Sequence, residues 1–209
     1  MASWFTGRVP IRRLGDQLYG AIVAQARQPL FYRGFAVPDT LEGRFEMVVL
    51  HMFVLLERLD GESEQGRDRG RAGIIAQAVV DALFRQLDDD MRELGIGDLT
   101  VPKKMRLAAA AFHDRLRAYR EALGSNDSGT LDNLLRRHVY QDCDADAAVP
   151  SRLADYLRLA LDLAGEQEFA TIETGRLDFP DPAGPARRGT AEEAGAQGSG
   201  RRGERPSDA

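Results

Sequence analysis

The sequence has a single cysteine, Cys143, and no long uninterrupted hydrophobic run. One cysteine excludes an internal disulfide and is typical of proteins that fold in a reducing compartment. The most apolar stretch, Met47–Leu56, has about half of the roughly 20 residues that a membrane-spanning helix needs. We therefore interpret it as a buried helix and expect at most peripheral contact with a membrane.

The first residues of the chain have neither the apolar core of a signal peptide nor a long leader rich in arginine and serine. A cytoplasmic location is expected, with at most peripheral contact with a membrane. The chain also lacks an excess of positive charge, since 28 Lys and Arg residues stand against 33 Asp and Glu residues. Without a basic groove interleaved with aromatic residues, nucleic acid is not an expected partner.

No run alternates apolar and polar residues as a half-buried strand would, whereas apolar residues recur at helical spacing almost throughout. A first helix is predicted from Pro10 to just before Pro29, followed by an irregular aromatic segment at Phe31–Phe35. Later helices are expected around Val80–Leu94, Met105–Leu123, Leu131–Val139, Leu153–Ala164 and Phe169–Thr174.

The second helix is predicted to form the centre of the fold. Asp39 and Glu42 have the spacing of a capping box at its start. A stripe of apolar residues then follows helical spacing, and further apolar residues beside it make the helix apolar nearly all round. The stripe consists of Leu41, Phe45, Val48, Met52, Leu55 and Leu59, and is widened by Val49, Phe53 and Leu56.

Polar and glycine-rich segments mark the expected boundaries. Gly61–Gly73 is interpreted as a loop or a frayed helix start, and Ser151 as the N-cap of a later helix. Residues 181–209 contain no large apolar side chain and cannot bury enough surface to offset the entropy of ordering. The sequence thus predicts one all-α domain of about six helices over residues 1–180, around a central apolar helix, with a disordered tail at 181–209.

An acidic pattern raises one enzymatic alternative. Asp89-Asp90-x-x-Glu93 fits the motif with which all-helical prenyl-transfer enzymes hold magnesium and diphosphate. Those enzymes need a second acidic motif on a facing helix, and the chain offers only the loop-like Asp142-x-Asp144-x-Asp146. A solvated helix face or a protein-contact patch is the favoured interpretation.

Other signatures of catalysis or cofactor binding are weak. Gly95-x-Gly97-x-x-Thr100 resembles a degraded dinucleotide fingerprint, but a helix rather than a strand precedes it, which favours a reversal between two helices. The three histidines and the cysteine lack metal-ligand spacing, and there is no nucleophile elbow. No catalytic, metal or cofactor-binding residues are predicted, so these patterns favour a binding protein over an enzyme.

Two longer segments resemble a known family. The first is Asp39–His51 with the preceding Phe31-Tyr32, and the second is Asp88–Met105, which contains Met-Arg-Glu-Leu-Gly-x-Gly-Asp-Leu-x-Val-Pro-Lys. Both resemble blocks of the ubiquinol–cytochrome c chaperone family. The resemblance extends over roughly Leu14 to Phe179 and leaves out the predicted tail.

This resemblance implies a non-enzymatic assembly factor of bacterial type. It would bind newly made cytochrome b and promote assembly of ubiquinol–cytochrome c reductase. Mitochondrial members act with a small partner protein close to the ribosome, and the resemblance leaves open a small co-chaperone and a ribosome contact for this chain. The alternative without the resemblance is a generic helical scaffold that binds a partner helix in a groove.

The resemblance also assigns partner contact to one short region, which has carboxylates before the predicted helix reversal and lysines after it. The alternative is that Arg92 and Lys103 only pair with neighbouring carboxylates. The residues assigned to partner contact are Asp88, Asp89, Asp90, Arg92, Glu93, Gly95, Gly97, Asp98, Pro102, Lys103 and Lys104.

Overall fold

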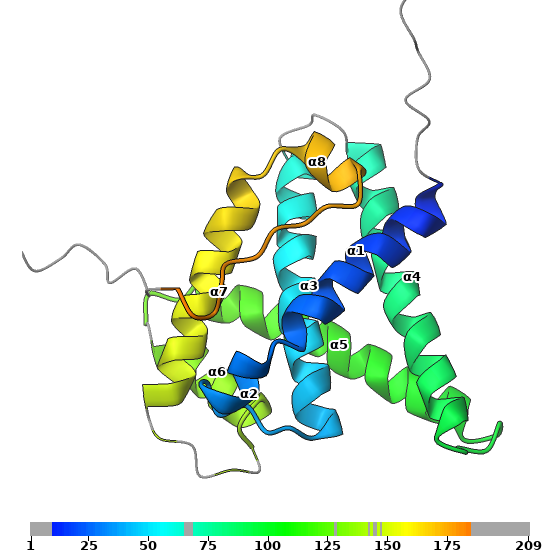
Figure 1. Cartoon of the computed structure of the whole chain (residues 1–209), viewed down its shortest axis with the longest axis horizontal. Helices are drawn as coiled ribbons and strands as arrows, with labels where there is room; N and C mark the ends of the chain where they lie inside the picture. Colours follow the sequence, from blue (N-terminus) through cyan, green and yellow to red (C-terminus); the bar gives the residue numbers. More distant parts are fainter. Residues whose placement is uncertain are drawn as a thin grey trace, which may run out of the picture.

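The computed structural model describes residues 10–64, 69–127, 129–141, 143, 146 and 148–184, and all regular secondary structure in these ranges is helical (Figure 1). Six longer helices and two single-turn helices, α2 and α8, follow one another along the chain. They are α1 (Ile11–Ala26), α2 (Pro29–Arg33), α3 (Leu41–Glu64), α4 (Arg69–Glu93), α5 (Val101–Leu123), α6 (Gly129–His138), α7 (Ala148–Glu166) and α8 (Phe169–Glu173). The predicted all-α class is confirmed.

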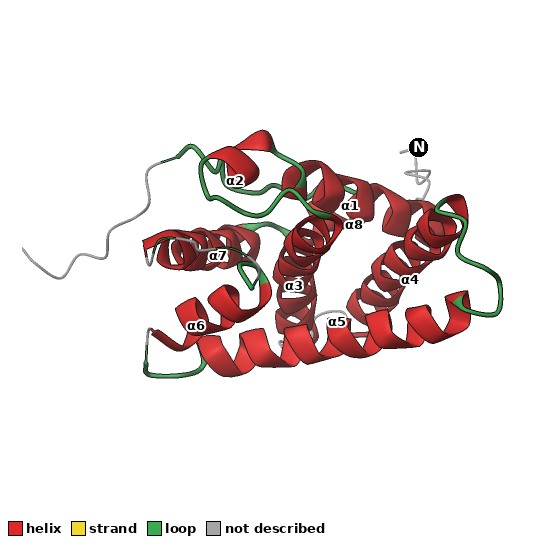
Figure 2. Cartoon of the chain, turned by 90° about the horizontal axis from the view of Figure 1, so that it is seen from below, coloured by secondary structure: helices red, strands yellow, loops and turns green. Residues whose placement is uncertain are grey.

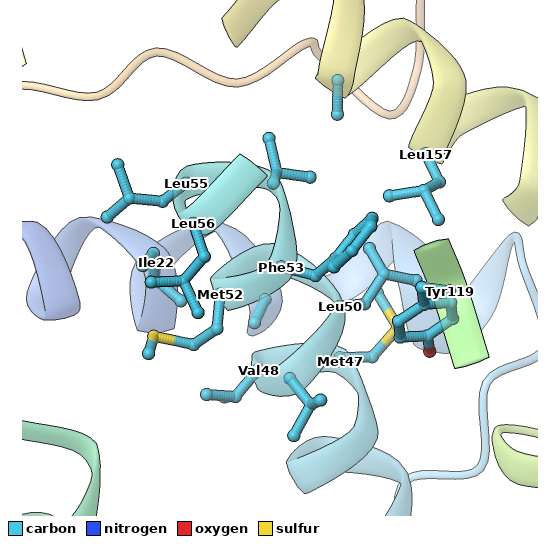
Figure 3. Close-up of a cluster of buried hydrophobic side chains, with 14 of the residues drawn as sticks. Ile22, Met47, Val48, Leu50, Met52, Phe53, Leu55, Leu56, Tyr119 and Leu157 are labelled. Carbon is cyan, nitrogen blue, oxygen red and sulfur yellow. The ribbon is translucent and has the colours of Figure 1, made fainter. Parts of the chain in front are cut away.

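Helix α3 lies at the centre of the fold, as its sequence predicts. It contacts α1, α4, α5 and α7, which surround it in Figures 1 and 2. Every residue from Met47 to Leu56 is buried, and Figure 3 shows side chains leaving this helix in all directions. A helix that is apolar nearly all round is stable in water only when other helices cover all of its faces. No helix of the described chain is long and apolar enough to cross a membrane.

The start of α3 differs from the predicted capping box. The hydroxyl of Thr40 accepts a hydrogen bond from the Gly43 backbone N–H at 3.1 Å, so Thr40 takes the capping role expected of Asp39. Asp39 instead forms an ion pair with Arg44, at 2.7 Å. Leu41, the first residue of the predicted core stripe, is 67% exposed, because the first turn of α3 extends beyond the helices that cover the rest.

The loop expected at Gly61–Gly73 is much shorter in the structure. Helix α3 continues to Glu64 and α4 begins at Arg69, so the glycines at 61, 70 and 73 all lie within helices. Residues 65–68 separate the two helices and lie outside the described residues. The packing of α3 and α4 against each other and against α1 outweighs the low helix propensity of glycine here.

Two other predicted boundaries also move. Helix α7 begins at Ala148, whose N–H donates to the Asp146 carboxylate at 3.0 Å, so Asp146 rather than Ser151 caps the helix. Ser151 lies inside α7 and hydrogen-bonds Asp132 of α6. Near the other end, Pro182 is buried, so the packed part of the chain continues past the boundary expected at residue 180. Residues 185–209 of the predicted tail lie outside the described residues.

The aromatic segment after α1 is also more regular than predicted. Its first part forms α2, with Pro29 in the first turn, and Phe31 and Phe35 are buried. The Phe31 ring meets His51 of α3 and Tyr156 of α7 edge-on, with ring centroids 5.4 and 4.9 Å away. These aromatic rings therefore belong to the core and do not form an exposed surface.

Close approach of α1 and α4 depends on Gly15. A β-carbon at this position would lie 2.5 Å from the carbonyl oxygen of Ala78, whereas one at Gly20 of the same helix would meet nothing within 4 Å. We expect Gly15→Ala to lower the free energy of unfolding by about 1–3 kcal/mol, because the helices must separate. Gly20→Ala should raise it by up to about 1 kcal/mol through better helix propensity. Urea titrations of both variants test this contrast, and equal effects would contradict it.

Candidate interaction surface

The reversal between α4 and α5 begins with a Schellman motif. Gly95 has φ +74°, its N–H donates to Arg92 O at 3.0 Å, and the N–H of Ile96 donates to Met91 O at 3.1 Å. A left-handed residue at this point favours glycine and ends the helix sharply. The predicted role of Gly95 in a helix reversal is thus confirmed. At Gly97 the backbone does not require glycine in this way, and a β-carbon would meet nothing within 4 Å.

Arg92 joins the two sides of the reversal. Its Nε donates to the Asp88 carboxylate at 2.8 Å, and its Nη1 donates to Asp98 at 2.6 Å. These bonds hold the pKa of Arg92 above its usual value, the bond to Asp88 contributing most. All three side chains are substantially exposed, so solvent screening keeps the contribution of each pair to stability small. The local pairing that the sequence left open therefore holds for Arg92.

Four other charged side chains of the reversal form no ion pair within the described part of the chain. In the described residues, no ion pair or hydrogen bond engages the side chains of Asp89, Glu93, Lys103 or Lys104, and all four are exposed. The alternative, in which Lys103 only pairs with a neighbouring carboxylate, thus finds no such pair there. Four unpartnered charges, two of each sign, leave a surface able to form ion pairs with a partner.

The acidic residues of α4 point to different surroundings and do not converge. Asp88 and Asp89 line a shallow hollow with Arg12, Phe84 and others, whereas Asp90 accepts a hydrogen bond from Gln86 at 2.7 Å. Asp90 also lies near Tyr19 of α1, whose pKa is raised to about 12, mainly by burial and then by this carboxylate. Among the described residues, no three His, Cys, Asp or Glu side chains are grouped to hold a metal ion.

Of the second acidic motif of the prenyl-transfer alternative, only Asp146 lies within the described residues. Asp142 and Asp144 lie outside the described residues, and Asp146 caps α7, which has no contact of note with the C-terminal end of α4. In the described part of the chain, the Asp89-Asp90-x-x-Glu93 pattern is therefore an isolated helix face.

Exposed leucines beside these charges were not predicted. Leu94 is 67% exposed and Leu99 is 98% exposed, both within the reversal, and Leu107 of α5 is 63% exposed. Leu94 is the last residue of the helix predicted around Val80–Leu94, and in the structure it lies just beyond the end of α4 at Glu93. Leucine between two polar residues in a loop, as at Leu99, is the signal that could have drawn attention to this surface. We call residues 88–107 the reversal surface.

This surface lies inside the part of the chain that matches a known family. The family model described as Ubiquinol-cytochrome C chaperone matches residues 33–179. The crystal structure of the Cbp3 homolog from Brucella abortus is similar to this fold, with a TM-score of 0.70 and 35% sequence identity. The match covers 81% of this chain and 90% of the Brucella abortus chain.

Curated relatives carry a related name. Ubiquinol-cytochrome c reductase complex assembly factor 1 of Drosophila melanogaster is 27% identical over 142 residues, 68% of this chain and 54% of that protein. The Xenopus laevis protein is 25% identical over 143 residues, 68% of each chain. The Homo sapiens protein is 22% identical over 142 residues, 68% of this chain and 45% of that protein.

The chain thus spans about half the length of the Drosophila and human relatives. The family match, in contrast, extends from the end of α2 almost to the end of the described chain, and the Brucella structure shares both sequence and fold with it. On this evidence, the chain belongs to the ubiquinol-cytochrome C chaperone family.

Proposed function

We propose that this chain is a non-enzymatic assembly factor of ubiquinol–cytochrome c reductase. It binds newly made cytochrome b through the reversal surface and acts at the cytoplasmic face of the inner membrane. Membership of the chaperone family and the names of the curated relatives support a role in assembly.

The observation that carries the choice of surface is the exposure of Leu99. A leucine that is 98% exposed gains little in the isolated chain, whereas burial against a partner would stabilise a complex by about 1.5–3 kcal/mol. In the sequence, the exposed Asp89 and Glu93 precede Leu99 and the exposed Lys103 and Lys104 follow it, so the reversal surface offers unpaired charges of both signs beside an apolar contact. Such an arrangement favours an oriented protein partner, because the charges fix its direction and the leucine supplies affinity.

Leu99→Asp is expected to reduce the amount of cytochrome b that co-purifies with the tagged chain by at least about tenfold. Loss of one buried anchor of about 1.5–3 kcal/mol corresponds to such a change in affinity. The melting temperature should stay unchanged, because the Leu99 side chain is almost fully exposed. The measurement is affinity purification from growing cells that express the variant in place of the natural chain, with cytochrome b quantified.

Leu41→Asp is the matched control. Leu41 is an exposed leucine too, at 67%, but it lies at the start of α3, outside the reversal surface. This variant should capture cytochrome b as well as the unchanged chain does. If Leu99→Asp also captures cytochrome b at the normal level, the reversal surface is not the client site. If the unchanged chain captures none, the proposed client is wrong.

A further inference from the structure

The last described residues form an extended segment that crosses the fold. After α8, residues 176–182, which we call the strap, run over α3 in the space between α1 and α7 (Figure 1). The strap has no regular secondary structure. Its polar backbone groups therefore need partners other than a helix or a sheet.

Side-chain amides supply those partners. Gln167, just after α7, donates from Nε2 to Asp178 O at 2.8 Å and accepts from the Asp178 N–H through Oε1 at 2.9 Å. One amide thus pairs with both backbone groups of one strap residue, as a neighbouring β-strand would. On the opposite side, Gln25 of α1 donates from Nε2 to Pro180 O at 3.0 Å.

The strap inserts alternate side chains into the fold. Leu177 is buried, and Phe179 is half-buried with its ring edge-on to His51, at 5.1 Å between centroids. Arg176 and Asp178 between them are exposed. Backbone hydrogen bonds combined with alternate side chains in pockets are the means by which proteins recognise extended peptides, whatever the residues between the pockets.

The floor beneath the strap is polar, within an otherwise apolar core. Gln25 Nε2 donates to the Tyr156 hydroxyl at 2.9 Å, and that hydroxyl lies 2.9 Å from His51 Nε2. The Gln167 backbone is also held in place, since Arg58 donates to Gln167 O from Nε at 3.2 Å and from Nη2 at 2.9 Å. The groups that grip the strap are therefore fixed by contacts outside the strap.

We propose that the groove between α1 and α7 binds an extended segment of a protein partner, and that the strap occupies it as an intramolecular stand-in. The partner segment would carry a leucine-like side chain and, two residues later, an aromatic side chain followed by proline, as Leu177-Asp178-Phe179-Pro180 does. This groove is separate from the reversal surface, and the inference does not depend on cytochrome b being the client.

Opening of the strap is physically reasonable because its backbone has no helix or sheet partners. Segments without such partners open at a lower free-energy cost than the core does. While closed, the strap competes from a high effective concentration, which for short linkers is about millimolar. A partner segment would therefore bind weakly to the closed chain and tightly once the strap is weakened.

The test uses the full chain and a fluorescent peptide that copies residues 174–184. The variant Leu177→Ser with Phe179→Ser weakens the strap without changing the groove, and we expect it to bind the peptide at least about tenfold more tightly than the unchanged chain does. A peptide with the same two serines is the matched control and should not bind. Adding Gln167→Ala to the strap variant should remove most of the gain, since it deletes both hydrogen bonds to the Asp178 position.

A milder variant covers the case in which the two serines unfold the chain. Asp178→Pro removes the backbone N–H that donates a hydrogen bond to Gln167 Oε1, and it changes no buried side chain. It should bind the same peptide severalfold more tightly than the unchanged chain. If a folded strap variant, judged by a cooperative melt, binds the peptide no better than the unchanged chain does, the groove is only the resting place of residues 176–182 and the proposal fails.

Discussion

Met52→Ala is expected to lower the free energy of unfolding by about 2–5 kcal/mol, the range measured for truncation of large apolar side chains in close-packed cores. Met52 lies at the middle of α3 and is completely buried (Figure 3). Because α1, α4, α5 and α7 all contact this helix, the cavity cannot collapse by movement of one neighbour alone. Guanidinium titration followed by helical circular dichroism measures the loss.

Phe45→Ala is the comparison within the same helix. Phe45 belongs to the same predicted stripe but is only half-buried, at the edge of the core. Although more atoms are removed, fewer of them leave a dry interior, so the loss should be smaller than for Met52→Ala. A larger loss at Phe45 would mean that the first turns of α3 are covered more tightly than the structure shows.

The centre of the fold was predictable because one strong local signal carried it. The spacing of apolar residues in α3 can be satisfied only when several helices surround it, so the sequence indicates both the helix and its place. Burial at Met47–Leu56 confirms this. The ends were less predictable, because exposure of Leu41 and capping by Thr40 depend on where the neighbouring helices stop.

Glycine residues predicted a loop wrongly in one region and a helix end correctly in another. Between α3 and α4, glycines suggested a loop, but burial of the apolar faces of both helices offset a propensity cost of about 1 kcal/mol per glycine. At Gly95, no β-carbon contact is at stake, and the left-handed backbone itself requires the residue. The helix reversal and its charged residues could therefore be located from the sequence.

The contacts that distinguish surface from core could not be predicted from local sequence patterns. Arg92 meets Asp98 only because the chain turns back on itself, and the 98% exposure of Leu99 depends on what fails to cover it. The polar network beneath the strap joins Gln25 to Tyr156, which are 131 residues apart. No local pattern encodes a pairing over that distance.

Among the described residues, both hydrogen-bond partners of the His51 ring are neutral. Its Nδ1 lies 2.7 Å from the Met47 carbonyl oxygen and its Nε2 lies 2.9 Å from the Tyr156 hydroxyl. A neutral ring that donates from Nδ1 and accepts at Nε2 satisfies both contacts. A charged ring would need an acceptor for a second N–H in this dry site. Burial therefore lowers the pKa of His51 from 6.5 to about 4, and the hydrogen bond to Met47 opposes part of this shift.

The free energy of unfolding should therefore fall as the pH drops below about 6.5. The unfolded chain then binds a proton at His51 that the folded chain does not, so the contribution of His51 is complete above the unfolded pKa and is lost between pH 6.5 and about 4. Over this whole interval the loss is about 3 kcal/mol, at about 1.4 kcal/mol for each pH unit. Urea titrations at pH 7, 6 and 5 measure it.

His51→Gln separates this loss from other titrations. The variant is less stable at every pH, because it disturbs the contacts with Tyr156 and Met47, but it should lose less stability than the unchanged chain between pH 7 and pH 5. His138→Gln is the matched control, since the pKa of His138 is also lowered, mainly by burial, but this histidine is only half-buried. Glu46 acts in the opposite direction, because burial raises its pKa and protonation relieves that cost. Equal pH dependence in the unchanged chain and in His51→Gln would mean that the pKa of His51 is the same in the folded and the unfolded chain, and the buried neutral ring bonded to Tyr156 would then have to be abandoned.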